Sequence, residues 1–140
     1  MTTPISVRFP EEVARRLRGR SAGSGEATSG LVVRLVDEGM RMAEHPGIVF
    51  RDGPAGRRAA LSAGPDVWEI MVVLKDFASG GVSEAIGVCA KSLGLTELQV
   101  RVAEHYYANY PQEIDGRIGL NTAAAERAQH ATEVRRRLYA

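Results

Sequence analysis

Cysteine is nearly absent from this sequence of 140 residues, and Cys89 is the one exception. A single cysteine excludes a disulfide within the chain, which favours a reducing compartment such as the cytoplasm. No apolar run approaches the roughly 18 residues that a membrane span needs, and the first residues lack the apolar segment typical of a signal peptide. We therefore expect a cytoplasmic protein that does not bind membranes.

Groups of residues typical of metal sites or catalysis are also missing. The three histidines, His45, His105 and His130, are far apart in the sequence, and none has the spacing of metal ligands. Cys89 lies among apolar residues at helical spacing, which is typical of a small buried side chain. The sequence thus predicts no catalytic residue, no metal ion and no cofactor, and we expect the protein not to be an enzyme.

What is present is an ordinary globular composition with basic charge near both ends. Hydrophobic residues make up 44% of the chain and charged residues 25%, so extensive disorder is not expected. The formal net charge is only +1, but arginines gather between residues 8 and 20 and again at residues 135–137. This distribution favours a nucleic-acid or acidic protein partner. We ascribe the excess of arginine over lysine first to the coding bias of a GC-rich genome.

Residues 1–45 predict one strand and two helices. Residues 5–9 alternate apolar and polar side chains, which is the pattern of a half-exposed strand. Pro10 ends the strand and suits the first turn of a helix over residues 11–20. The Ser- and Gly-rich stretch 21–25 predicts a turn. A second helix is expected from Thr28 or Ser29, as cap, to about residue 44.

Residues 46–116 predict a small second domain in which a hairpin precedes several helices. Segments 48–51 and 58–61 flank a Gly- and Pro-containing turn, which indicates a β-hairpin. Asp66 is expected to cap the next helix, Ser83 to begin another, and Thr96 to begin a third after a break at Gly94. The aromatic residues of this domain (Trp68, Tyr106, Tyr107 and Tyr110) lie at helical spacing with aliphatic residues. We interpret them as core residues and not as a base-stacking surface.

Residues 117–140 predict a helix-prone tail with little apolar surface. Its large apolar residues from Thr122 onward are Val134, Leu138 and Tyr139, which is a narrow stripe for packing on a core. We expect this tail to be frayed or to be ordered by a partner. The fold class predicted from the whole sequence is mainly α, with one small hairpin.

The strand at residues 5–9 needs a partner because unpaired backbone N–H and C=O groups are costly to bury. Antiparallel pairing with the same strand of a second chain, around a two-fold axis, provides hydrogen-bond partners for N–H and C=O groups of the strand. Ile5, Val7 and Phe9 would then face the helices, and Ser6 and Arg8 would face outward. A two-stranded ribbon of this kind fits the major groove of DNA. The alternative for Ser6 and Arg8 is a solvated edge strand.

This N-terminal stretch resembles the ribbon-helix-helix family of bacterial repressors and antitoxins. The resemblance rests on the segment Ile-Ser-Val-Arg-Phe-Pro-Glu-Glu-Val at 5–13, the Gly-Ser-Gly turn, and the segment beginning at Thr28. It implies an intertwined homodimer that binds operator DNA. By position, it implies base contacts from Ser6 and Arg8, with Pro4 in place of the usual third polar residue. It also implies phosphate contacts at the start of the second helix, from Ala27, Thr28 and Ser29.

Three features of residues 46–115 carry a second, weaker resemblance: the hairpin ahead of Asp-Val-Trp-Glu-Ile at 66–70, the segment Gly-Gly-Val-Ser-Glu-Ala-Ile at 80–86, and the segment Leu-Thr-Glu-Leu-Gln-Val-Arg-Val-Ala-Glu-His-Tyr-Tyr at 95–107. They resemble a small helical domain of antitoxins from bacterial toxin–antitoxin operons, in which the partner is usually a PIN-like ribonuclease. This resemblance implies a cognate toxin as a further partner. The domain also resembles a helix-turn-helix, and we favour packing and partner contact over a second DNA surface because its charge is slightly acidic. The predicted toxin-binding residues are those at the end of the tail: Arg135, Arg136, Arg137, Leu138 and Tyr139. Two alternatives remain, a protein-interaction adaptor that dimerises through the ribbon and a transcriptional regulator without a toxin.

Overall fold

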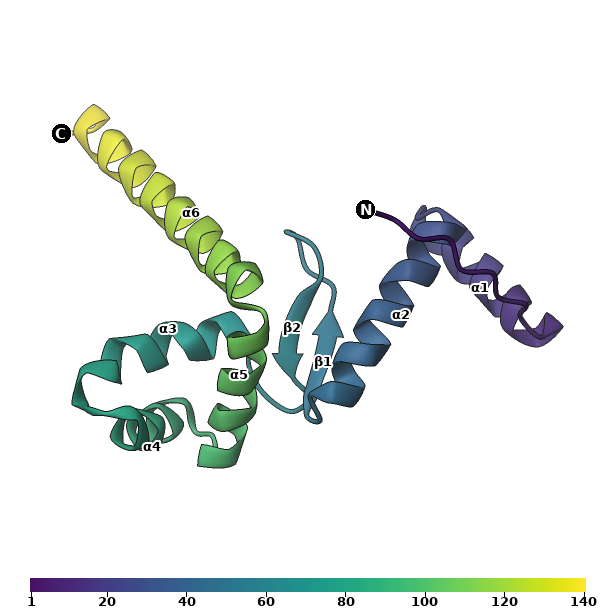
Figure 1. Cartoon of the computed structure of the whole chain (residues 1–140). Coiled ribbons are helices and arrows are strands. Elements are labelled where there is room, and N and C mark those ends of the chain that lie inside the picture. The colour runs from purple at the N-terminus through teal and green to yellow at the C-terminus, as the bar shows by residue number, and fades with distance from the viewer. The chain divides into compact units, whose positions relative to one another are not determined.

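The computed structural model describes all 140 residues and is mainly helical, with a single two-stranded sheet (Figure 1). The chain divides into two compact units, Met1–Arg41 and Met42–Ala140. Each unit is described separately below. The expected class, a mainly α protein with a small hairpin, is therefore confirmed, whereas the pairing of two chains through a ribbon remains a prediction.

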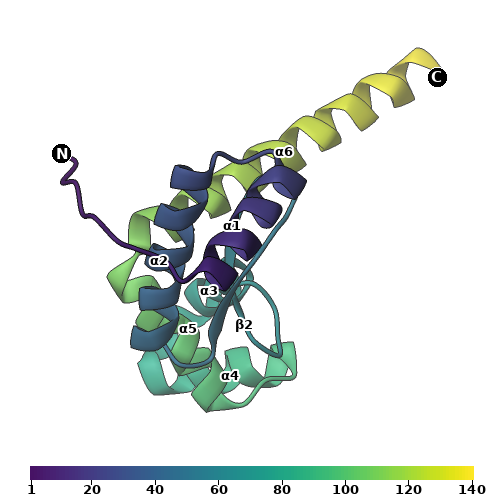
Figure 2. The same cartoon turned by 90° about the vertical axis from the view of Figure 1, so that its right-hand side faces the viewer.

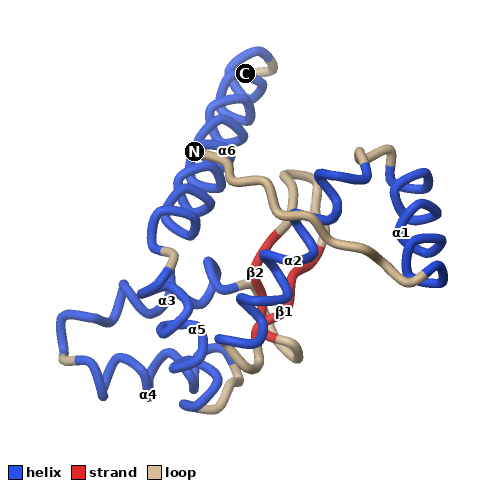
Figure 3. The backbone as a smooth tube through the Cα atoms, turned by 45° about the vertical axis from the view of Figure 1, so that its right-hand side comes forward, coloured by secondary structure: helices blue, strands red, loops and turns tan.

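The first unit contains an irregular N-terminal segment followed by helix α1 (Glu11–Ser24) and most of helix α2 (Thr28–Glu44). Residues 1–10 form no strand in the single chain, and Figure 3 draws them as loop. A strand needs a hydrogen-bonded neighbour, and this segment has none within its own chain. Helix α1 extends beyond the expected residue 20 because Gly25, at φ 72°, provides a left-handed C-cap. The turn expected over residues 21–25 is accordingly wrong for its first four residues.

The second unit begins with the hairpin that the sequence predicts. Strand β1 (Ile48–Arg51) pairs antiparallel with β2 (Arg58–Leu61), and Ile48 lies opposite Leu61 in the register. Helix α3 (Val67–Phe77) and a 3-10 turn (η1, Ala78–Gly80) follow the hairpin. The remaining elements are three helices: α4 (Val82–Leu93), α5 (Glu97–Asn109) and α6 (Pro111–Leu138).

Helices α3, α4 and α5 pack against one another, and both strands of the hairpin contact α5 (Figure 3). The largest fully buried side chains of this core lie on these helices: Val67, Ile70, Ile86, Cys89, Val100 and Tyr106. Cys89 is buried as expected, and burial raises the pKa of its thiol. The second unit therefore has a hydrophobic core of its own.

The helix boundaries follow recognisable capping signals. Gly94 ends α4 at φ 66°, and Thr96 begins α5 with a capping box in which the side chains of Thr96 and Gln99 each accept a backbone N–H. Leu98 lies four residues before half-buried Val102 on α5, yet it is 71% exposed. Residues four positions apart on a helix are displaced by about 40° around its axis. A row of residues at four-residue steps from 98 to 110 therefore turns away from the buried face. That face is instead formed by Val100, Ala103 and Tyr106.

Helix α6 is continuous from Pro111 and passes through residue 117, where we expected a separate tail to begin. Pro111 occupies its first turn, where the missing N–H costs nothing. The early part of the helix packs on the core through buried Ile114 and half-buried Ile118. Figure 2 shows that the distal half extends away from α3, α4 and α5. The tail is thus a regular helix in the structure, not a frayed one.

Candidate nucleic-acid interface and partner-binding surfaces

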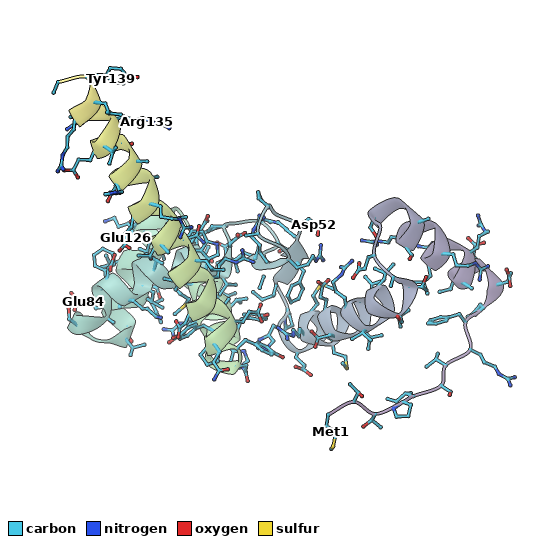
Figure 4. All side chains as sticks on the ribbon, turned by 90° about the horizontal axis from the view of Figure 1, so that it is seen from above. Met1, Asp52, Glu84, Glu126, Arg135 and Tyr139 are labelled. Atoms are coloured by element: carbon cyan, nitrogen blue, oxygen red, sulfur yellow. The ribbon has the colours of Figure 1, made fainter.

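The N-terminal segment exposes every one of its side chains. The apolar residues of the alternating pattern are 83% exposed at Ile5, 63% at Val7 and 43% at Phe9. Pro4, Ser6 and Arg8, the residues predicted to contact bases, are also exposed, and Arg8 forms no ion pair. Figure 4 shows Met1 at the end of this extended stretch of chain. The predicted strand thus presents both of its faces to solvent in one chain.

The two helices of the first unit bury few of their apolar side chains. Helix α1 has no buried residue, and Leu31 is the one buried apolar residue among the first 41. Val33, Val36 and Met40 of α2 are all more than half exposed, and Val13 of α1 is partly so. Uncovered aliphatic residues at this density mark an interaction surface. The first unit therefore lacks a covering layer within its own chain.

The N-terminus of α2 is open to an anion. Ala27, Thr28 and Ser29 are exposed, and the first turn contains no acidic residue. The Thr28 hydroxyl donates to Ser21 Oγ at 3.1 Å, and the N–H of Leu31 donates to the carbonyl of Ala27, so Ala27 precedes the first turn and not the expected Thr28 or Ser29. The neighbouring acid, Glu26, accepts two hydrogen bonds from Arg34 at 3.2 and 2.8 Å. The free N–H groups and the helix dipole therefore favour a phosphate at this end.

The arginines of α1 differ in their partners. Arg15 pairs with Glu12 at 2.6 Å and Arg18 with Glu11 at 3.3 Å, and all four side chains are exposed. Arg16 and Arg20 are exposed and form no ion pair with the chain. Exposed pairs of this kind contribute little to stability. Arg16 and Arg20 thus remain available to an anionic partner.

The predicted toxin-binding residues lie together at the free end of α6, where Figure 4 labels Arg135 and Tyr139. Arg135, Arg136, Arg137, Leu138 and Tyr139 are all exposed. Arg137 pairs with Glu133 of the preceding turn, whereas Arg135 and Arg136 form no ion pair. The end of the helix thus combines positive charge with two uncovered apolar side chains.

The base of α6 is held to the second unit by polar contacts as well as by Ile114. Lys75 Nζ of α3 lies 2.6 Å from Asp115 Oδ1, and the Tyr107 hydroxyl donates to the same carboxylate at 3.1 Å. Arg117 donates to the carbonyls of Ala55 at 3.1 Å and Arg57 at 3.2 Å. The hydrogen bond and charge of Lys75 lower the pKa of Asp115, and Asp115 raises the pKa of Lys75.

Asp66 and the aromatic residues have structural roles. Asp66 precedes α3 as expected, but its carboxylate caps no N–H; it accepts from Arg58 Nε and from Trp68 Nε1, the latter at 3.2 Å. Tyr106 is fully buried and its hydroxyl donates to Glu113 at 3.2 Å. Trp68, Tyr107 and Tyr110 pack, partly buried, against the same core. The prediction of core aromatics is therefore confirmed.

The fold brings together two histidines that no motif in the sequence connects. His45 precedes β1 and His105 lies on α5, 60 positions later, yet their Nδ1 atoms are 3.2 Å apart. No short-range spacing could have revealed a pair that only the fold creates. No group of three or more His, Cys, Asp and Glu side chains gathers elsewhere into a metal-binding arrangement.

Comparison of the chain with protein-family models, with curated proteins and with solved structures finds no match. None of the helices combines the length and the apolar character that crossing a membrane requires.

Proposed function

We propose that the protein is a homodimeric DNA-binding repressor of the ribbon-helix-helix type that also neutralises a ribonuclease toxin. The observation that carries this proposal is the uncovered N-terminal segment, in which Ile5, Val7 and Phe9 alternate with Ser6 and Arg8 while all five are exposed. Full burial of each large apolar side chain contributes about 1.5–3 kcal/mol. Pairing two copies of the segment buries the three apolar residues and forms hydrogen bonds between the facing backbone edges of the two strands.

The uncovered faces of α1 and α2 support the same arrangement. In a two-fold dimer the ribbon lies across four helices, and the exposed residues Val13, Val33 and Val36 supply apolar surface for such a core. An isologous pair is the commonest assembly of soluble proteins. Dimerisation thus accounts for a unit that has almost no core in one chain.

Two features favour DNA as the ligand of this dimer. Ser6 and Arg8 point outward from a ribbon whose apolar residues point inward, and arginine donates bidentately to guanine in the major groove. The open N-terminus of α2 at Ala27, Thr28 and Ser29 is suited to a backbone phosphate. The ribbon would distinguish bases while the helix ends fix its position.

The test combines oligomeric state with DNA binding. Light scattering on the full chain is expected to give a dimer, and a mobility-shift titration is expected to give sequence-specific binding to the DNA upstream of its own coding region. Val7→Asp places a charge inside the ribbon and is expected to abolish both properties, whereas Ser79→Asp in the second unit is expected to abolish neither. A monomeric wild-type chain would overturn the proposal. A dimer with no sequence-specific shift would favour the adaptor alternative.

The free end of α6 supports the toxin-binding part of the proposal. An exposed helix with Leu138 and Tyr139 beside Arg135 and Arg136 suits a partner that has an apolar groove next to acidic residues. A ribonuclease of the PIN type holds metal-binding carboxylates, so these arginines would neutralise its active site.

Truncation after Asn121 tests the tail because it leaves Ile114, Asp115 and Arg117 in place. The truncated chain is expected to remain a DNA-binding dimer and to lose affinity for the nuclease encoded beside it, by calorimetric titration. Replacement of Arg135, Arg136 and Arg137 by glutamine is expected to weaken the same complex without changing helicity. Unchanged nuclease affinity in both variants would remove this role from the tail.

A further inference from the structure

His45 and His105 form a pair that the proposed function does not use. Their rings are tilted by 51° with centroids 4.9 Å apart, and the closest atoms are the two Nδ1 nitrogens at 3.2 Å. Both residues belong to the second unit, so the pair does not depend on dimerisation or DNA. Two nitrogens at this distance share either a proton or a cation.

The geometry agrees with what one cation requires of two ligands. Zinc binds imidazole nitrogen at about 2.0–2.1 Å in a tetrahedral arrangement, which places two nitrogen ligands about 3.3 Å apart. The observed distance of 3.2 Å between the two Nδ1 atoms is close to this spacing. In the alternative state one Nδ1–H donates to the other Nδ1, and the second proton of the neutral pair lies on Nε2.

The surroundings hold one imidazole still and leave the other accessible. His45 is only 4% exposed, and the edges of Tyr106 and Tyr110 pack against it with centroids at 5.2 and 5.9 Å. His105 is exposed. Both histidines line a cavity of about 230 Å³ with Pro46, Leu98, Arg101 and Val102. A water takes up roughly 30 Å³ of liquid, so the cavity has room for the waters that would complete a coordination shell.

We propose that the Nδ1 atoms of His45 and His105 form a binding site for a late first-row divalent cation, with Zn²⁺ as the reference ion and water as the remaining ligands. Imidazole suits Zn²⁺, Cu²⁺ and Ni²⁺, whereas Mg²⁺ and Ca²⁺ prefer oxygen ligands. Cation binding moves the shared proton from Nδ1 to Nε2. The guanidinium of Arg101, which lines the same cavity, repels the cation and limits the affinity.

Long-range ¹H–¹⁵N NMR of the imidazoles during a Zn²⁺ titration tests this site in the full chain. The resonances of His45 and His105 are expected to change together, each ending with its proton on Nε2, while Mg²⁺ produces no change. Calorimetry is expected to show that His105→Ala weakens Zn²⁺ binding at least tenfold, since loss of even an outer-shell partner costs 10–100-fold. Arg101→Gln is expected to tighten binding.

His130→Ala is the matched control because His130 lies on the exposed distal part of α6, away from the pair in the sequence. This variant is expected to bind Zn²⁺ like the wild type. Because His105 is exposed, its variant is expected to retain the wild-type circular dichroism spectrum. A zinc response that His130→Ala removes and His105→Ala leaves would overturn the proposal, as would imidazole resonances of His45 that zinc does not change.

Discussion

Arg8 is the residue on which sequence discrimination would depend. It lies in the exposed N-terminal segment and forms no ion pair in the single chain. A guanidinium without a competing carboxylate keeps all of its donors for a base edge. Arg16 of α1 has the same charge and is also unpaired, but it lies on a helix and suits at most a phosphate contact.

Arg8→Ala is therefore expected to cost about 1–3 kcal/mol in operator binding and to relax the preference at one base-pair position. Arg16→Ala is expected to weaken all DNA sequences alike and to reduce the salt dependence of binding. Fluorescence anisotropy with operator and scrambled duplexes at several salt concentrations distinguishes the two. Equal losses on operator and scrambled DNA for Arg8→Ala would contradict a base contact.

Single residues were predictable where a local rule decides them. Gly94 and Thr96 act through the backbone within a few positions, so their capping roles followed from the sequence. Asp66 did not follow, because Arg58 from the neighbouring strand and Trp68 compete for its carboxylate. The contact between His45 and His105 likewise depends on packing across 60 positions, which no local pattern contains.

The contact between helix α6 and helix α3 contains a salt bridge whose contribution to stability can be measured. The salt bridge from Lys75 to Asp115 joins it to α3, and Lys75 Nζ also lies 4.7 Å from the centre of the Tyr107 ring. The pKa of Asp115 is lowered chiefly by its hydrogen bond with Lys75. A carboxyl group whose pKa is lower in the folded state stabilises the fold above its unfolded pKa, and this contribution is lost as the pH falls through the folded value.

Asp115→Asn is expected to lower the thermal stability of the second unit slightly at neutral pH, because both groups of the pair are largely exposed. The difference from the wild type is expected to decrease once the pH falls below the ordinary aspartate value of 3.8, and to disappear below the lower pKa that Asp115 has in the folded state. It is also expected to shrink above pH 10.5 as Lys75, whose pKa is raised, finally loses its proton. Asp76→Asn, an exposed neighbour on α3, is the control for melting curves. A difference that does not shrink as the pH is lowered would exclude the salt bridge as its cause.

Most elements could be predicted because their signals are periodic and local. The hairpin matched its expected residues, since β1 and β2 flank a turn rich in Gly and Pro. The extent of α6 was harder to anticipate because its distal half has almost no apolar stripe, and α1 exceeded its expected end through a favourable C-cap at Gly25. The fate of residues 5–9 could not be resolved from one chain, since a strand is defined by its partner.

At the scale of the whole molecule, the two units differ in the source of their folding stability. The second unit buries a contiguous core, whereas the first buries Leu31 alone among its apolar residues. A unit without a core gains its stability from association, and such stability depends on protein concentration. The two units are therefore expected to unfold in separate transitions.

A hundredfold increase in protein concentration is expected to raise the melting temperature of the first transition and to leave that of the second unchanged, as measured by calorimetry. Binding that stabilises the folded state by mass action contributes about 2.7 kcal/mol at a hundredfold excess over the dissociation constant. Val7→Asp is expected to remove the first transition only, with Ser79→Asp as the control. If neither melting temperature changed with protein concentration, the first unit would be stable by itself.

For the repressor that we propose, the nearly coreless first unit has a consequence for gene control. The amount of operator-competent protein would rise with the square of the number of chains while dimers are scarce. At low concentration, as in newly made or diluted protein, the chains would be monomers in which the second unit is folded and the N-terminal segment is unpaired. These monomers would not bind the operator. Repression would therefore begin over a narrow range of protein concentration. The concentration of the chain would itself determine when its operator is occupied.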